Sequence, residues 1–148
     1  MKILMMNGPN LRLLGTREPE IYGSETLDDI FGKLTAWASD KGVQIDAFQS
    51  DVEGDLVARI GGAGGHYDGI IINPAAYTHT SVALRDAIKA CGIPVVEVHL
   101  SNTHRREAFR QRSLTAGVCL GQVMGFGGQG YVMALEGLVQ AILSRKGF

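Results

Sequence analysis

The sequence predicts a single α/β domain in which helices cover both faces of a five-stranded parallel sheet, a doubly wound arrangement. Short β-branched apolar runs alternate with amphipathic stretches along the chain, which is typical of βαβ units with right-handed crossovers. The run Gly69–Asn73 is apolar up to its last residue, as expected for a strand buried on both faces. The 148 residues suit one domain, residues 1–148, and leave no room for two well-formed cores.

The elements are expected in strict alternation, and each rests on a local pattern. The strands are β-branched or apolar runs that end in polar residues or turns, at Lys2–Met6, Gln44–Phe48, Gly69–Asn73, Pro94–Val98 and Val118–Met124. The helices carry apolar residues at helical spacing, at Thr26–Lys41, Asp55–Gly61, Ser81–Cys91 and Gly130–Ser144. Thr26 and Asp29 have the spacing of a capping box, and Thr80 is the expected N-cap of the third helix. This order favours a flavodoxin-like sheet.

The composition excludes several classes of function. The chain carries 14 basic and 15 acidic residues, so it has no charge pattern for nucleic acid or an anionic membrane. No apolar run approaches the roughly 20 residues of a membrane span, and the N-terminus turns polar at Asn7, too early for a signal peptide. Cys91 and Cys119 lack paired spacing, so we expect neither a disulfide nor a zinc framework, and a reducing cytoplasm is the expected compartment.

Glu97 and His99 are the least expected residues in the chain. They stand two apart in a strand otherwise made of valines, so both side chains point to one face. A buried carboxylate needs a partner, and a Glu beside a His fixes the imidazole tautomer and stabilises its protonated form. The pair therefore predicts an oriented general acid; the alternative is a buried hydrogen bond with no chemical role.

Arg17 and Tyr22 lie in a long segment between the first strand and the first helix, bracketed by Gly15 and Gly23. Such long βα loops are often active-site lids. A nearby guanidinium favours the phenolate of a tyrosine, so the two residues together predict a general base. The alternative is a surface loop with a solvated arginine and a packed tyrosine ring.

Three further features have weaker signals. His79 precedes a helix, whose N-terminus attracts anions, but it also fits a simple capping segment. Of the three arginines Arg105, Arg106 and Arg110, we expect about one to touch a ligand, because most of a charge run is solvated. Asp86 alone indicates only a solvated helix face.

Two other motifs do not lead to a function. Gly125–Gly130 matches G-x-G-x-x-G, but the chain ends before the strand and acidic residue that a dinucleotide site needs, so close helix packing is the better interpretation. Metal binding by His79, Glu97 and His99 lacks any typical ligand spacing. We therefore expect no metal.

Taken together, the motifs resemble the type II 3-dehydroquinate dehydratase family over nearly the whole chain and in the right order. The matching segments are 7–11, 15–23, 48–50, 73–87, 97–102 and 125–131. The resemblance implies a flavodoxin-like fold, a dodecamer of four trimers, and dehydration of 3-dehydroquinate to 3-dehydroshikimate in the shikimate pathway without cofactor or metal. The same reaction in quinate catabolism remains open, as does a non-enzymatic flavodoxin-like binding module, although the hydroxyl-rich phosphate loop of a flavin carrier is missing.

The resemblance also implies a role for each site residue. Tyr22 is similar to the base, Arg17 to the residue that lowers the pKa of that base, and His99 with Glu97 to the acid. Asn10 is similar to the residue that holds the oxygen stabilising an enolate. The implied substrate-binding residues are Asn73, His79, Leu100, Ser101 and Arg110, with Asp86 reaching a neighbouring subunit's site. Arg12 stands where the family often has Asn, and Ala76 and Phe126 stand where Gly and Leu are common.

Overall fold

The structure, a computed structural model, describes residues 1–16 and 18–144, with the side chain of Tyr22 excepted. Its centre is one sheet of five parallel strands in the order β2-β1-β3-β4-β5. The strands are β1 (Lys2–Asn7), β2 (Gln44–Gln49), β3 (Gly69–Asn73), β4 (Val95–His99) and β5 (Gly121–Met124). This is the flavodoxin-like order, so the predicted fold class is confirmed.

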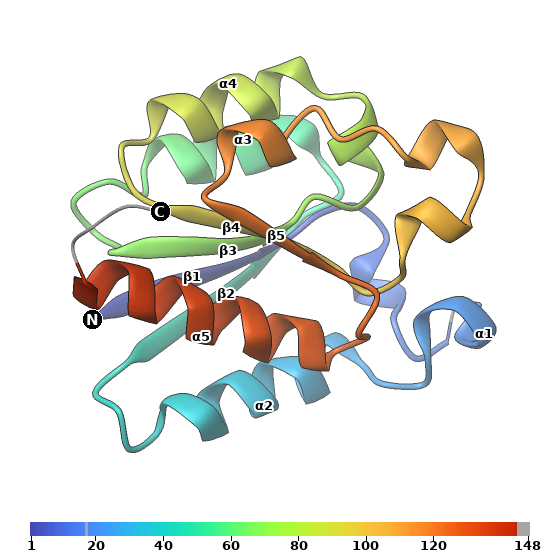
Figure 1. Cartoon of the computed structure of the whole chain (residues 1–148). Helices are drawn as coiled ribbons and strands as arrows, with labels where there is room; N and C mark the ends of the chain where they lie inside the picture. The colour runs from blue at the N-terminus through green and yellow to red at the C-terminus, as the bar shows by residue number, and fades with distance from the viewer. Residues whose placement is uncertain (17, 145–148) are drawn as a thin grey trace.

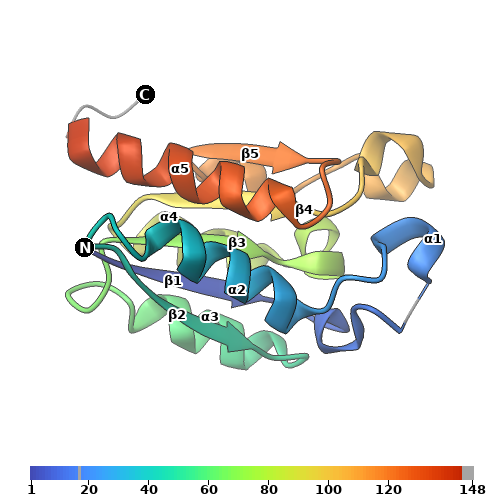
Figure 2. The same cartoon turned by 90° about the horizontal axis from the view of Figure 1, so that it is seen from below.

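Helices cover both faces of the sheet. Helices α2 (Leu27–Ala38) and α5 (Gln129–Ser144) pack side by side on one face, and α3 (Glu53–Gly61) and α4 (Val82–Ala90) pack on the other (Figures 1 and 2). Each face has its own apolar core, because successive residues of a strand point to opposite sides. In β1, for example, Ile3 and Met5 join the first core, whereas Leu4 and Met6 join the second.

Helix starts follow local capping chemistry. Thr26 and Asp29 form the predicted capping box at the start of α2, with both reciprocal hydrogen bonds present. The prediction for α4 was wrong by one residue: Ser81, not Thr80, is the N-cap, and its hydroxyl accepts from the backbone N–H of Leu84 at 2.9 Å.

The predicted strand Val118–Met124 begins later than expected. Residues Ala116–Val118 form a short 3₁₀ helix, η5, and β5 starts at Gly121. The hydroxyl of Ser113 accepts from the backbone N–H of Thr115 and of Ala116, which turns the chain before the strand begins. This turn brings the hydroxyls of Ser113 and Thr115 to Glu97 of β4.

The long segment after β1 contains two short helices. It contains a 3₁₀ helix, η1 (Leu11–Leu13), and a four-residue helix, α1 (Pro19–Tyr22). Pro19 suits the first position of a helix, and Gly23, at φ 81°, ends it. Figures 1 and 2 both show α1 at the end of the sheet where the short helices of residues 103–110 also lie, so the carboxyl ends of the strands face these segments.

The glycine-rich run before α5 serves packing. A side chain at Gly128 would collide with Glu25 and Ile30 beside α2, and Gly130 lies against Val98 and Val123 of the sheet. These contacts agree with the interpretation of the G-x-G-x-x-G match as close helix packing. No helix in the described part of the chain is long and apolar enough to cross a membrane.

Candidate active site

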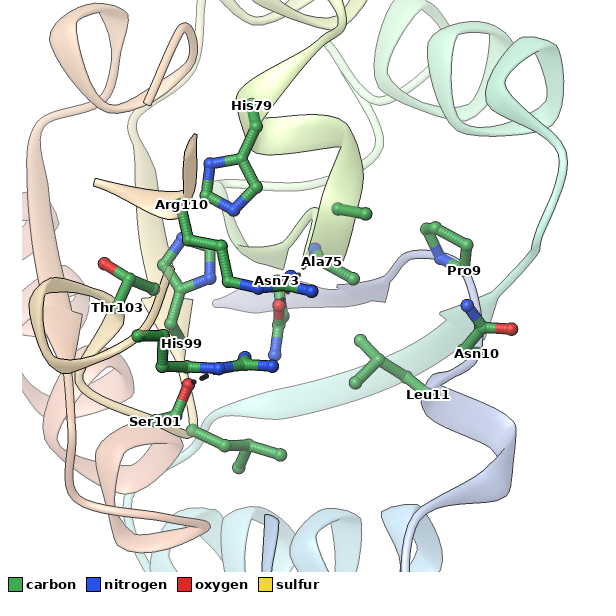
Figure 3. Close-up of a pocket in the computed structure, with 13 residues that line it drawn as sticks. Pro9, Asn10, Leu11, Asn73, Ala75, His79, His99, Ser101, Thr103 and Arg110 are labelled. Atoms are coloured by element: carbon green, nitrogen blue, oxygen red, sulfur yellow. Dashed lines mark hydrogen bonds between the residues drawn. The ribbon is translucent and has the colours of Figure 1, made fainter. Parts of the chain in front are cut away.

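A cavity of about 110 Å³ lies at the carboxyl end of the sheet. Parallel strands bring the segments that follow β1, β3 and β4 to this one edge, and the cavity draws its lining from all three: Pro9, Asn10, Leu11, Asn73, Ala75, Ala76, His79, His99, Leu100, Ser101, Thr103, Arg106 and Arg110. Figure 3 shows the residues after β1 on one side of this space and His79, His99, Ser101 and Arg110 on the other. Most of the predicted site residues therefore do converge.

The Glu97–His99 pair is built as the strand spacing predicts. His99 Nε2 lies 2.8 Å from Glu97 Oε2, with Glu97 fully buried and His99 6% exposed. Burial raises the pKa of Glu97, but hydrogen bonding and charge from His99, together with neighbouring hydroxyls, hold that pKa below its ordinary value. The carboxylate only accepts, so Nε2 carries a proton. Nδ1 is then the ring nitrogen left to exchange a proton with a bound molecule.

Four side chains besides His99 donate to Glu97, and we call them the donor cluster. Their atoms are the hydroxyls of Thr78, Ser113 and Thr115 and the amide Nε2 of Gln122. Analysis of the sequence missed all four. The sequence carried a signal for Gln122, because it is a polar residue in the expected fifth strand, and that strand pairs with β4 so that Gln122 lies opposite Glu97. The hydroxyls come from irregular segments that carry no periodic pattern.

Asn73 is held by its own network at the end of β3. Its Nδ2 donates to Tyr131 Oη at 3.0 Å, and Tyr131 donates to Asn7 Oδ1 at 2.7 Å. Asn73 Oδ1 accepts from the backbone N–H of Ala75 at 3.0 Å. Ala75 takes φ 53°, a conformation that favours glycine. The glycine-like position in this segment is thus Ala75 rather than Ala76.

His79 and Arg110 approach the cavity from the side opposite Asn10. His79 Nδ1 lies 2.7 Å from the backbone carbonyl of Arg112, so it donates there and leaves Nε2 as the nitrogen facing other partners. Arg110 forms an ion pair with Glu107, and this pairing lowers the pKa of Glu107. Both side chains line the cavity, with Arg110 already oriented by its carboxylate partner.

Leu100 and Ser101 follow β4 directly and line the cavity together with Arg106. Arg106 Nη1 donates to Ser101 Oγ at 3.3 Å (Figure 3, dashed line). Sequence reasoning assigned a ligand contact to about one arginine of the run, but both Arg106 and Arg110 line the cavity. This gives the cavity two guanidinium groups at its wall.

Asp51 holds the segment on the other side of the cavity. Its carboxylate accepts from the backbone N–H of Asn10 at 2.9 Å, from Arg12 Nε at 3.1 Å and from Gln49 Nε2 at 3.0 Å. These hydrogen bonds lower the pKa of Asp51, and the bond from Asn10 contributes most. Asn10 itself takes φ 69°, so Asp51 stabilises an uncommon backbone conformation. The charge of Arg12, a departure from the resembled family, is therefore paired.

Two predicted residues fall outside what the structure describes. Arg17 lies outside the described residues, and so does the side chain of Tyr22. The backbone of α1 is described: Glu20, Ile21 and Gly23 line another space, of about 470 Å³, together with Leu100 and Ser101. The helix that carries Tyr22 therefore borders the same strand end as the cavity.

Asp86 is not brought to the site. It is exposed on α4 and is absent from the described residues that line the cavity. Among residues 1–16 and 18–144, no group of three or more His, Cys, Asp or Glu side chains is placed to hold a metal ion.

Comparison with known proteins gives one consistent family. The model of the class II dehydroquinase family matches residues 1–139. The 3-dehydroquinate dehydratase of Geotalea daltonii is 57% identical over 142 residues, which is 96% of this chain and 99% of the relative. That of Prochlorococcus marinus is 56% identical over 146 residues, 99% and 98% of the two chains. A crystal structure of type II dehydroquinase from Butyrivibrio crossotus superposes with a TM-score of 0.91 at 44% identity and covers 94% of this chain and 97% of its own.

Proposed function

The chain belongs to the class II dehydroquinase family, and we propose that the cavity at the carboxyl end of its sheet eliminates water from 3-dehydroquinate to give 3-dehydroshikimate. The observation that carries the proposal is the buried Glu97–His99 pair, joined at 2.8 Å, with the imidazole at the wall of the cavity. A carboxylate-supported imidazolium is the acid that expulsion of a hydroxyl group needs. Family membership favours this enzyme over a non-enzymatic binding module.

The first step is removal of a proton from the carbon next to the ketone. We assign the base to Tyr22, as a phenolate favoured by the guanidinium of Arg17. The C–H electron pair moves to the ketone oxygen, which gives an enolate. Asn10, at the cavity wall, holds the oxygen that stabilises this charge, and such stabilisation is often the largest catalytic term.

The second step is loss of the hydroxyl group. The enolate electrons re-form the ketone, the C–O bond breaks, and the departing oxygen takes a proton from His99 to leave as water. Glu97 stays ionised and steadies the imidazolium before it gives up its proton. The product is a conjugated enone, and solvent returns a proton to His99 while Tyr22 loses one.

The remaining residues bind the substrate. We assign its carboxylate to the backbone N–H groups of Leu100 and Ser101, with Arg106 and Arg110 as nearby cations. Asn73 and His79 are assigned to its hydroxyl groups. No lysine is among the described residues that line the cavity, which supports a route without an imine intermediate.

We further propose that the enzyme works as a homo-oligomer, a dodecamer of four trimers, in the cytoplasm and in the biosynthetic shikimate pathway. Asp86 lies exposed on α4 away from its own cavity, which supports a role toward a neighbouring subunit. Cys91 and Cys119 are both free thiols, which supports a reducing compartment.

The decisive experiment follows the ultraviolet absorbance of the enone when the protein is mixed with 3-dehydroquinate, with and without a chelator. We expect turnover in both cases.

Tyr22→Phe should abolish turnover and keep the fold, and near-normal activity would remove Tyr22 from the role of base. His99→Ala should lose dehydration but retain exchange of the substrate's α-proton; a covalent adduct trapped by borohydride would contradict the mechanism.

A further inference from the structure

Glu97 has more hydrogen-bond donors than the orientation of His99 requires. Besides His99, its carboxylate accepts from Thr78 at 3.1 Å, from Ser113 at 3.0 Å, from Gln122 at 2.7 Å, and from Thr115. Four of these five donors, all but Thr115, lie at Oε2, and a carboxylate oxygen offers only about two lone-pair positions, so the donors outnumber what that oxygen accepts at one time. The donor cluster is therefore built around a full negative charge.

Proton counting among the hydroxyls supports the same conclusion. The oxygens of Thr78 and Ser113 are 2.7 Å apart, those of Thr78 and Thr115 are 2.7 Å apart, and those of Ser113 and Thr115 are 3.2 Å apart. Each hydroxyl has one proton, and a proton directed to Glu97 is not available to a neighbouring hydroxyl. The three protons are therefore shared between the contacts to Glu97 and the contacts between hydroxyls, and the neighbouring anion favours the arrangements in which they point to it.

The donor cluster joins three separate parts of the fold. Thr78 lies in η2 (Ala75–His79), Ser113 and Thr115 lie between η4 (Ala108–Arg110) and η5, and Gln122 lies on β5 opposite Glu97. Thr78 and Thr115 are buried. Polar side chains from distant segments meet at one carboxylate; Ser113 also holds a local turn through its bonds to the backbone, whereas Thr78 and Gln122 reach Glu97 from other parts of the fold.

We propose that the donor cluster consists of positioning residues that act through Glu97 on the acid step of the dehydration, an inference that rests on the proposed function. Each donor takes up part of the carboxylate's charge, so less of it remains to hold the proton of the imidazolium. With the cluster intact, His99 releases its proton readily to the departing hydroxyl. With a donor removed, Glu97 holds that proton more tightly and His99 becomes a weaker acid.

Other ionisable groups around the pair set the background against which this effect is measured. A further cavity, of about 200 Å³, also touches His99 and is lined by His79, His104 and Arg110. The ionisable groups that line this cavity or the 110 Å³ cavity, or that are affected by the charge of Glu97, are His79, His104, Arg106, Arg110 and Cys119. Burial and, after it, the charge of Glu97 raise the pKa of the Cys119 thiol to about 12, so that thiol stays neutral. None of these side chains belongs to the donor cluster, so all of them remain in the variants below.

The test is the pH profile of kcat for Thr115→Val, which keeps the shape of the side chain and removes its hydroxyl. We expect a lower plateau and an alkaline limb moved to higher pH by about half a unit, because a hydrogen bond to a charged group exceeds one pKa unit and His99 feels part of it. Glu97→Gln should move the limb the opposite way. Gln122→Leu, at an exposed position, should repeat the upward shift without risk to folding.

The matched control is Thr103→Val. Thr103 is also a buried threonine beside His99, but its hydroxyl lies against Met124 Sδ at 3.5 Å and not against Glu97. Its alkaline limb should stay at the wild-type pH, whatever its rate. An unmoved or lowered limb in both Thr115→Val and Gln122→Leu would overturn the proposal.

A second readout does not need turnover. NMR titration of protein labelled in its histidine rings, with the His99 signal assigned by its loss in His99→Gln, should show the same upward shift for Thr115→Val and Gln122→Leu. If the wild type dehydrates nothing, the proposed function fails, whereas this titration still tests the cluster. If the wild type is active and the His99 titration does not move, only the present inference fails.

Discussion

Replacing Tyr131 by Phe removes one oxygen atom from beneath the cavity. That oxygen is fully buried, donates to Asn7 Oδ1 at 2.7 Å and accepts from Asn73 Nδ2 at 3.0 Å. Burial raises the pKa of the Tyr131 hydroxyl well above its ordinary value, so it remains a neutral donor. The variant loses two hydrogen bonds and leaves one acceptor and one donor without a partner. At about 1–2 kcal/mol for each group, the loss of stability is about 2–4 kcal/mol.

Calorimetry at fixed subunit concentration checks this value. For a chain of this size, 2–4 kcal/mol corresponds to a fall in Tm of about 6–12 °C. The control is Tyr67→Phe, since Tyr67 Oη bonds Asp46 at a partly exposed site where water can replace it; there we expect a loss below about 1 kcal/mol. Tyr131→Phe should also raise KM more than it lowers kcat, because Asn73 loses its support. Equal losses of stability in the two variants would refute the reasoning.

Three further outcomes follow from the contacts. Ala75→Gly should stabilise the protein by about 1 kcal/mol in urea unfolding, because Ala75 has φ 53°, whereas Ala76→Gly should destabilise it by about 0.5–1 kcal/mol; the reverse order would contradict the strain argument. The pKa of Glu97 is lowered in the fold, so its contribution to stability is present above the ordinary value of 4.5 and is lost as the pH falls below it. Glu97→Gln should therefore show a flatter acid-unfolding curve than the wild type, and parallel curves would show that the lowered pKa is absent. Asp51→Ala should reduce kcat roughly tenfold in steady-state kinetics, because it releases the backbone of Asn10. Asp51→Asn should lose less activity, because its amide oxygen still accepts from Asn10. Full activity in both variants would exclude a role of Asp51 in supporting Asn10.

The sequence predicts those parts of the site that follow from strand geometry. Glu97 and His99 share a face because a strand alternates its side chains, and Asn73, His79 and Ser101 converge because parallel strands end at one edge. Ser113 and Thr115 were not predictable in this way. They reach Glu97 through a turn made by hydroxyl-to-backbone bonds, and such turns leave no periodic signal in the sequence. The same turn shortened the expected strand at Val118.

The prediction of Thr80 as the N-cap of α4 was wrong for a related reason. Thr80 and Ser81 are both good capping residues, but Thr80 ends the preceding 3₁₀ helix, with its backbone N–H donating to Tyr77, and Ser81 caps α4. Ala75 likewise carries no local sign of its left-handed backbone. That conformation is imposed by Asn73, whose oxygen accepts the N–H of Ala75. In both cases a short-range hydrogen bond, from Leu84 to Ser81 and from Ala75 to Asn73, selects the conformation, and no periodic pattern in the sequence marks it.

The proposed acid, His99, and the proposed base, Tyr22, belong to parts of the molecule of very different local stability. His99 ends β4, which is buried along its whole length between two strands, so its backbone amides should exchange with deuterium only when the domain unfolds globally. Tyr22 ends a four-residue helix whose other residues are exposed, a segment that can open alone. Mild denaturant should therefore inactivate the enzyme while its core remains folded, and its thermal inactivation should precede the calorimetric transition.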